Sequence, residues 1–223
     1  MRVILFGATG MVGQGVLREC LLDNRVDAVL AIGRSPTGVR HAKLSEIVRP
    51  DLFHYSDIED QLRGFDACFF CIGVSSVGMP EDEYERLTYQ LTLAAAETLS
   101  RLNPNMTFIY VSGAGTDSSG KGRTAWARVK GRTENAIFLL PFRGAYAFRP
   151  AFIMAAHGER AKSAVYRALY RAFGPLLPAV RRLVPDYVLT TEQVGRAMIH
   201  VARHGAAKQV LESSDIRAIN YPS

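Results

Sequence analysis

Short apolar runs alternate with segments whose apolar residues recur at helical spacing along the first two thirds of the chain. A short apolar run predicts a strand buried on both faces, and the 3.6-residue spacing predicts an amphipathic helix. The predicted strands cover residues 3–6, 28–32, 52–55, 67–72, 106–111 and 145–148, and the predicted helices cover residues 11–22, 81–102 and 125–140. This order predicts an α/β fold built on a doubly wound, mostly parallel sheet.

The alternation lapses from Pro150 onward. Residues 161–173 have a helical pattern, and Thr190 or Thr191 is placed to cap a helix that continues through 195–202. No linker separates this last third from the rest of the chain. We therefore expect one domain over residues 1–223, in which residues 150–223 form a small cap on the substrate side.

Three glycines follow the first predicted strand and open the first predicted helix, in the pattern Gly7-x-x-Gly10-x-x-Gly13. The first glycine permits a sharp turn, the second lets a pyrophosphate approach the backbone, and the third lets the helix pack closely on the sheet. The helix N-terminus then offers free N–H groups to the phosphates. The pattern predicts a Rossmann fold whose dinucleotide contacts come from Gly7, Thr9, Gly10, Met11, Val12 and Gly13.

The end of the second predicted strand indicates which dinucleotide is bound. NAD-selective folds place an Asp or Glu there for the ribose hydroxyls, whereas this chain has Arg34 and Ser35. A guanidinium pairs bidentately with a phosphate, and a hydroxyl adds a further hydrogen bond. We expect NADP(H) to be preferred, with NAD(H) binding and a merely solvent-exposed Arg34 as the alternatives.

Three features together resemble the extended and atypical short-chain dehydrogenase/reductase superfamily, and in particular its small epimerase-like members. They are the glycine pattern, the strand end Val111-Ser112-Gly113-Ala114, and Trp126-Ala-Arg-Val-Lys130 at the start of a helix. The resemblance covers residue 2 to about residue 153 and includes Phe148-Arg149-Pro150.

The resemblance implies roles for several further residues. Asp57 and Ile58 would lie near the adenine, and Gly73 would approach the ribose and nicotinamide side. Ser112 would hydrogen-bond a substrate carbonyl, and Lys130 would bind the nicotinamide ribose hydroxyls.

Trp126 occupies the position at which the family carries its catalytic tyrosine. An indole N–H has no accessible proton-transfer pKa and cannot act as a general acid or base. One interpretation is an NADP(H)-binding oxidoreductase with modified catalysis, acting on a small carbonyl or sugar-like substrate. Another is a non-catalytic protein that senses NADPH. Tyr84, Tyr89 or an ordered water is the alternative source of the proton.

Charge and composition indicate which partners and which cellular compartment to expect. The 223 residues carry a formal charge of +6 without a dense basic tract, which argues against nucleic acid as partner. The three cysteines and the absence of a signal-peptide pattern at the start predict a reducing compartment, and we expect a cytoplasmic protein. Residues 160–182 form a basic amphipathic segment, so contact with a membrane remains an alternative to packing on the domain. The protein is expected to be a monomer or a homodimer.

Two further constellations are interpreted as structural. Cys68 and Cys71 have redox spacing, but side chains three apart in a strand point to opposite faces, so core packing is favoured. His200 and His204 lie one helical turn apart without an evident third ligand, so a metal site is not predicted.

Overall fold

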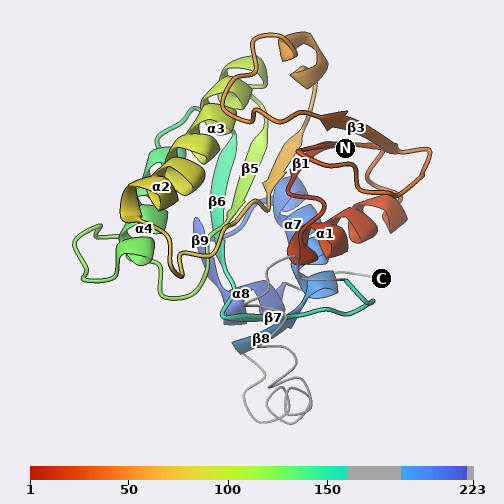
Figure 1. Ribbon diagram of the computed structural model, residues 1–223. Helices are drawn as coiled ribbons and strands as arrows, with labels where there is room; N and C mark the ends of the chain where they lie inside the picture. Colours follow the sequence, from red (N-terminus) through yellow and green to blue (C-terminus); the bar gives the residue numbers. More distant parts are fainter. Residues whose placement is uncertain (160–186, 220–223) are drawn as a thin grey trace.

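Seven parallel strands form one sheet in the order β3–β2–β1–β4–β5–β6–β9 (Figure 1). In the computed structural model, residues 1–159 and 187–219 are described. The strands of the sheet are β1 (Arg2–Phe6), β2 (Ala28–Gly33), β3 (Leu44–Val48), β4 (Ala67–Phe70), β5 (Thr107–Val111), β6 (Gly144–Arg149) and β9 (Val210–Glu212). A second, two-stranded sheet pairs β7 (Phe152–Met154) with β8 (Val188–Thr190).

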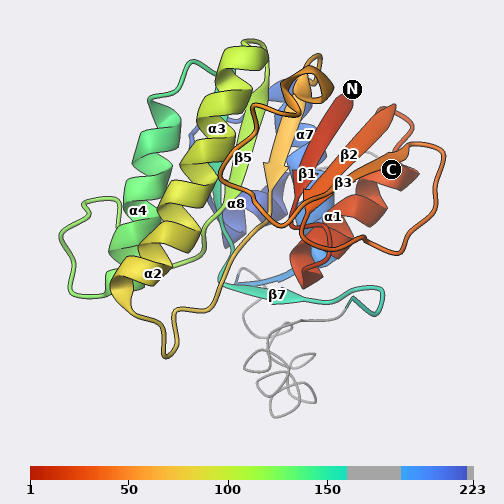
Figure 2. The same cartoon turned by 45° about the horizontal axis from the view of Figure 1, so that its top comes forward.

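Helices cover both faces of the large sheet (Figure 2). On one face lie α1 (Met11–Leu22) and α7 (Thr191–His204); on the other lie α2 (Glu81–Glu85), α3 (Leu91–Leu102) and α4 (Ala125–Phe138). A π-helical turn (Arg86–Gln90) joins α2 to α3, so the long helix expected over 81–102 is present with one wide turn. A 3-10 turn (Glu59–Leu62) and α8 (Ser213–Ala218) complete the described elements. The predicted doubly wound Rossmann fold is confirmed.

The two faces bury separate apolar cores. Side chains of odd-numbered β1 positions, such as Val3 and Leu5, pack with α1 and α7. The alternate positions Ile4 and Phe6 pack with α3 and with Ile137 of α4. This alternation explains why the central strands have continuous apolar sequences, since each successive side chain enters a different core.

The third strand is not where the pattern predicted it. The apolar run 52–55 is a loop whose Leu52 and Tyr55 side chains are buried against the α3 core, and the Tyr55 hydroxyl donates to the Leu52 carbonyl. The strand at this position in the sheet is β3, an edge strand with exposed Ser45 and Glu46. An edge strand needs no continuous apolar run, which is why the sequence pattern missed it.

Near the C-terminus, Thr190 caps α7 through a reciprocal capping box with Gln193. Thr190 is one of the two capping residues that the sequence predicts. The basic segment 160–182 and the predicted helix 161–173 lie outside the described residues. In the part of the chain that is described, no helix combines the length and apolar character needed to cross a membrane.

Candidate functional site

The loop between β1 and α1 has the geometry of a phosphate cradle. Gly7 adopts a φ of +80°, and a Cβ there would lie 2.7 Å from the backbone carbonyl of Cys71 on the neighbouring strand end. A Cβ on Gly13 would lie 2.0 Å from the Gly7 carbonyl oxygen, so the helix can approach the strand only with glycine at this position. Both residues are required by close backbone contact.

The first turn of α1 is free to receive an anion. Gly10 is the N-cap, no side chain caps the helix, and the first turn holds no acidic residue. Met11 and Val12 are half-buried, and because they lie in the first turn their backbone N–H groups have no partner inside the helix. Thr9 precedes them, and its carbonyl accepts from the Gln14 side chain at 3.0 Å. This arrangement fits a dinucleotide pyrophosphate.

A small pocket lies between this loop and the end of β2. Its lining includes Gly7, Thr9, Gly33, Ser35, Thr37 and Glu46. Arg34 is exposed beside it and has no ion-pair partner among the described residues. The structure thus brings Ser35 to the glycine loop, as expected, and it adds the Glu46 carboxylate from β3, which the sequence analysis did not identify.

Asp57 is tied to the same region through Arg49. The Arg49 backbone N–H donates to the Gly33 carbonyl at 2.9 Å, and its guanidinium donates to the Asp57 carboxylate at 3.0 Å. The remaining Nη1 group of Arg49 is buried without a partner in the described structure. Ile58 is buried, whereas Asp57 is exposed. Asp57 is therefore linked through Arg49 to the end of β2, and its expected contact with the adenine stays a prediction.

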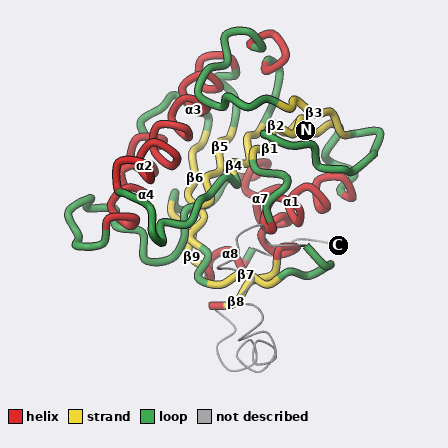
Figure 3. Tube along the Cα trace, in the orientation of Figure 1, coloured by secondary structure: helices red, strands yellow, loops and turns green. Residues whose placement is uncertain are grey.

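The loops that follow β1, β4 and β5 lie at one edge of the sheet (Figure 3). Gly73 follows β4, and a Cβ on it would meet nothing within 4 Å, so this loop is open on that side. Ser112 and Gly113 follow β5. The carboxyl edge of the sheet therefore collects the predicted contacts for the phosphates, the ribose and the substrate, as Rossmann folds do.

Lys130 and Trp126 share one face of α4, one turn apart. The Lys130 amine lies 5.9 Å from the centre of the indole ring and donates to the backbone carbonyl of Ser112. A Cβ on Gly113 would lie 3.6 Å from this amine. Burial lowers the pKa of Lys130 to about 8, against the opposing effect of the Glu134 carboxylate. The amine is thus held at the strand end, beside the position of the missing tyrosine.

The Ser112 hydroxyl points elsewhere. It donates to the Glu134 carboxylate and lies 3.3 Å from the Phe148 carbonyl oxygen. Glu134 is fully buried and also accepts from Nε of Arg149 at 3.0 Å, and Arg149 reaches Ser118 as well. For Ser112 to bind a substrate carbonyl, its hydroxyl would have to leave this network. Its predicted catalytic role stays a prediction.

This buried network was not found from the sequence. Glu134 stands one helical turn after Lys130, and Arg149 belongs to the recognised Arg-Pro pair, but their contact joins α4 to β6. A buried carboxylate almost always needs a positive partner, so a Glu on the inner face of a helix was the available signal.

Of the remaining constellations, the two cysteines pack in the cores, whereas His200 is half-buried and His204 is exposed at the end of α7. Cys68 packs in the α3 core and Cys71 against the α1 core, which confirms that they face opposite ways, and both thiols are free. Burial raises the pKa of Cys71 to about 12. The rings of His200 and His204 are 4.8 Å apart, and within the described residues no group of three or more His, Cys, Asp or Glu side chains is arranged to hold a metal.

Comparison with known proteins identifies the family. The model of the NAD dependent epimerase/dehydratase family matches residues 3–127, which include the glycine loop and Trp126. The chain belongs to the NAD dependent epimerase/dehydratase family. It has the nicotinamide dinucleotide-binding Rossmann fold of that family, and the resemblance inferred from the motifs is confirmed.

Individual proteins resemble the chain over most of its length. It is 23% identical over 205 residues to "Protein FMP52, mitochondrial" of Debaryomyces hansenii, covering 91% of this chain and 88% of that protein. It is 25% identical over 218 residues to Protein HTATIP2 of Rattus norvegicus, covering 96% and 87%. The fold is similar, with a TM-score of 0.66 and 15% identity, to the enzyme WbmH of Bordetella bronchiseptica solved with NAD+, covering 95% and 74%.

These relatives correct one expectation. The cytoplasmic location expected from the cysteine count and the N-terminal sequence is contradicted, because the FMP52 relatives from several fungi are named mitochondrial proteins. A low cysteine count is compatible with more than one reducing compartment, so composition did not distinguish between them.

Proposed function

We propose that this family member binds NADP(H) in preference to NAD(H) and acts as an oxidoreductase on a small carbonyl or sugar-like substrate. The observation that carries the cofactor preference is the position of Arg34. It lies exposed beside the pocket between the glycine loop and the end of β2, with Ser35 in the pocket lining. No acidic residue follows β2 itself. A bidentate guanidinium–phosphate contact favours a ribose that carries a 2′-phosphate.

The residues of the chain have separable tasks in this proposal. The N–H groups of Met11 and Val12 hold the pyrophosphate, and Asp57, held by Arg49, lies beside the adenine. The Lys130 amine donates to the nicotinamide ribose hydroxyls. A bound nicotinamide would supply a hydride to a carbonyl substrate or accept one from an alcohol. The substrate oxygen gains a proton in the first direction and loses one in the second, and the Trp126 indole can neither provide nor take up that proton.

The cofactor proposal is tested by calorimetry on Arg34→Ala. Loss of the bidentate contact should weaken NADPH binding by about 1.5–3 kcal/mol and leave NADH binding nearly unchanged. Arg40→Ala is the matched control, because Arg40 is also exposed in the same loop. Equal affinities for NADPH and NADH in the unmodified protein would contradict the proposal.

Trp126 favours a second candidate function, that of a non-catalytic protein that senses NADPH. The two candidates differ in turnover, which stopped-flow NADPH oxidation with a panel of carbonyl substrates measures. If the rest of the site is competent, Trp126→Tyr should raise turnover 10²–10⁴-fold, the usual contribution of a general acid. Trp126→Phe removes the indole without adding a hydroxyl and should give no increase.

A different result would show another proton source. Rapid turnover by the unmodified protein that is lost when Tyr84 or Tyr89 is replaced would identify that tyrosine as the proton source. Trp126 would then only pack against its neighbours. Tyr84 is buried on α2, and the Tyr89 ring lies 5.9 Å from the Arg132 guanidinium.

We further propose a small-molecule partner rather than nucleic acid, and a monomer or homodimer. The names of the fungal relatives favour a mitochondrial setting. Membrane contact through 160–182 is a lesser alternative that flotation with anionic liposomes would test.

A further inference from the structure

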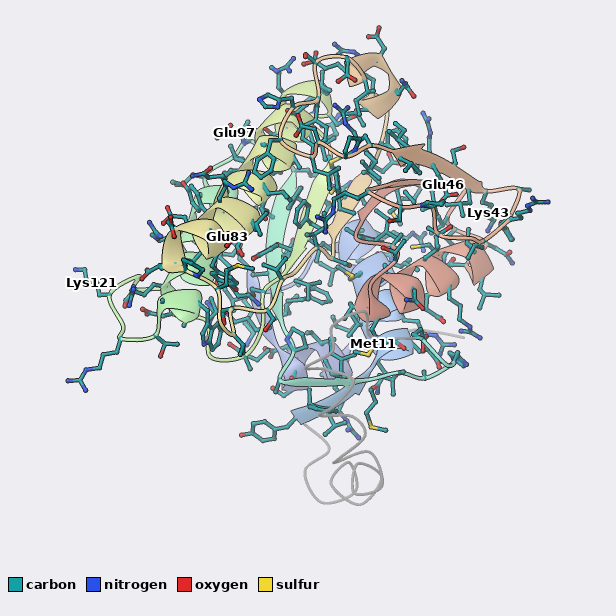
Figure 4. All side chains as sticks on the ribbon, viewed as in Figure 1. Met11, Lys43, Glu46, Glu83, Glu97 and Lys121 are labelled. Carbon is teal, nitrogen blue, oxygen red and sulfur yellow. The ribbon has the colours of Figure 1, made fainter. Side chains whose placement is uncertain are left out.

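The small pocket between the glycine loop and the end of β2 contains a carboxylate. This carboxylate does not come from β2, the strand that supplies the acidic residue in NAD-selective folds. Glu46 belongs to edge strand β3 (Figure 4). It pairs in register with Ala31 of β2. Ala31 packs in the α1 core, so Glu46 lies on the same face of the sheet as α1 and the glycine loop. Its side chain lines the pocket together with Thr9, Gly33 and Ser35.

Glu46 also fixes the loop that carries the phosphate-binding residues. Its carboxylate accepts the Thr37 backbone N–H at 2.7 Å. Thr37 lines the same pocket, three residues after Arg34. The donor that would otherwise be available to an anion beside Arg34 and Ser35 is therefore already used by a negative charge of the protein.

A carboxylate in this place affects the two cofactors in opposite ways. It can accept hydrogen bonds from the ribose hydroxyls of NAD(H), which is the task of the acidic residue in NAD-selective folds. A 2′-phosphate instead meets a like charge and finds the Thr37 N–H engaged. Arg34 and Glu46 thus oppose each other across one pocket.

We infer that Glu46 is a specificity-determining residue that limits the preference for NADPH and retains binding of NADH. The inference rests on the proposed dinucleotide site. It predicts that the protein uses a balance of two charges, in which Arg34 attracts the 2′-phosphate and Glu46 repels it. Removing the Arg34 charge should lower the ratio of NADPH to NADH affinity, and removing the Glu46 charge should raise it.

The test is calorimetric titration of NADPH, NADH, 2′,5′-ADP and 5′-ADP into Glu46→Gln. Contacts between exposed charges are weakened by solvent, and one such contact changes affinity by up to roughly fivefold. Glu46→Gln should therefore bind NADPH and 2′,5′-ADP more tightly by about this factor and NADH more weakly, without any measurement of activity. Glu97→Gln makes the same change of net charge at an exposed position of α3, on the other face of the sheet, and should change neither affinity.

Three further outcomes are decisive. Glu46→Asp keeps the charge and should keep a ratio of NADPH to NADH affinity near that of the unmodified protein. This variant therefore gives a testable result even where the Gln variant misfolds. A ratio of NADPH to NADH affinity that is unchanged in Glu46→Gln but altered in Arg34→Ala would overturn the role of Glu46 and leave the proposed function intact. Failure of every variant and of the unmodified protein to bind any of the four nucleotides would overturn both.

Discussion

At the scale of single residues, the Lys130 amine carries the clearest electrostatic signature. It is half-buried beside Trp126, donates to the Ser112 carbonyl, and burial of the amine lowers its pKa from the ordinary value of 10.5 to about 8. The fold therefore disfavours its charged form. Between about pH 8 and 10.5 the unfolded chain binds more protons at this lysine than the native protein does, so stability rises with pH across that window.

This lysine can be isolated by comparison with Lys130→Met. The free energy of unfolding of the unmodified protein, relative to the variant, should increase by roughly 3 kcal/mol between pH 7 and pH 10.5. Urea denaturation at both pH values measures it. Other titrating groups are common to both proteins and cancel in the difference. A difference that does not change with pH would mean that the native amine titrates normally.

The sequence predicted those site residues whose partners are close along the chain. Trp126 and Lys130 are four apart on one helix in a pattern that the family resemblance identifies, and Ser35 follows a strand end. Glu46 and Arg49 were missed because each contacts a partner eight or nine residues away in a neighbouring loop, a separation that follows neither helical nor strand periodicity. No local pattern encodes such pairings.

At the scale of elements, the start of α1 separates folding from binding. A Cβ on Gly13 would lie 2.0 Å from the Gly7 carbonyl oxygen, whereas a Cβ on Gly10 would approach only that same oxygen, at 3.4 Å. The backbone cannot absorb the first contact, but it tolerates the second. The open side of Gly10 is the side that the pyrophosphate would occupy.

The two alanine variants should therefore fail differently. Gly13→Ala should be strongly destabilised and express poorly. Gly10→Ala should keep a melting temperature close to that of the unmodified protein and lose most of its NADPH affinity, as measured by calorimetry. A Gly10→Ala protein that binds NADPH normally would show that the pyrophosphate lies elsewhere.

Elements were predictable where burial imposed a pattern. The central strands and α1 agree with the expected ranges to within a residue or two, because strands buried on both faces and an amphipathic helix leave clear periodicities. Edge strand β3 and the three-residue strand β9 lack such a pattern. Their places are set by pairing with β2 and β6, which sequence periodicity does not report.

At the scale of the whole molecule, the C-terminal part is joined to the N-terminal part through one core. Val194, Met198 and Val201 of α7 are buried in the same cluster as Val3 and Leu5 of β1. Gly15 of α1 approaches Thr191 so closely that a Cβ would lie 2.4 Å from the threonine Cβ. Strand β9 extends the sheet beyond β6. The residues after 187 therefore complete the fold that begins at residue 1.

We expect the full chain to unfold as one domain, because the shared core would be exposed to water if either part opened alone. Differential scanning calorimetry should show one transition with equal calorimetric and van't Hoff enthalpies. NADPH at a hundred times its Kd should add about 2.7 kcal/mol and raise the midpoint by roughly 5–10 °C. A chain ending at residue 159 should lack cooperative unfolding and bind no NADPH, because the α1 face of its sheet has lost α7. Two resolved transitions, or a truncated chain that binds NADPH, would show instead that residues 1–159 fold independently.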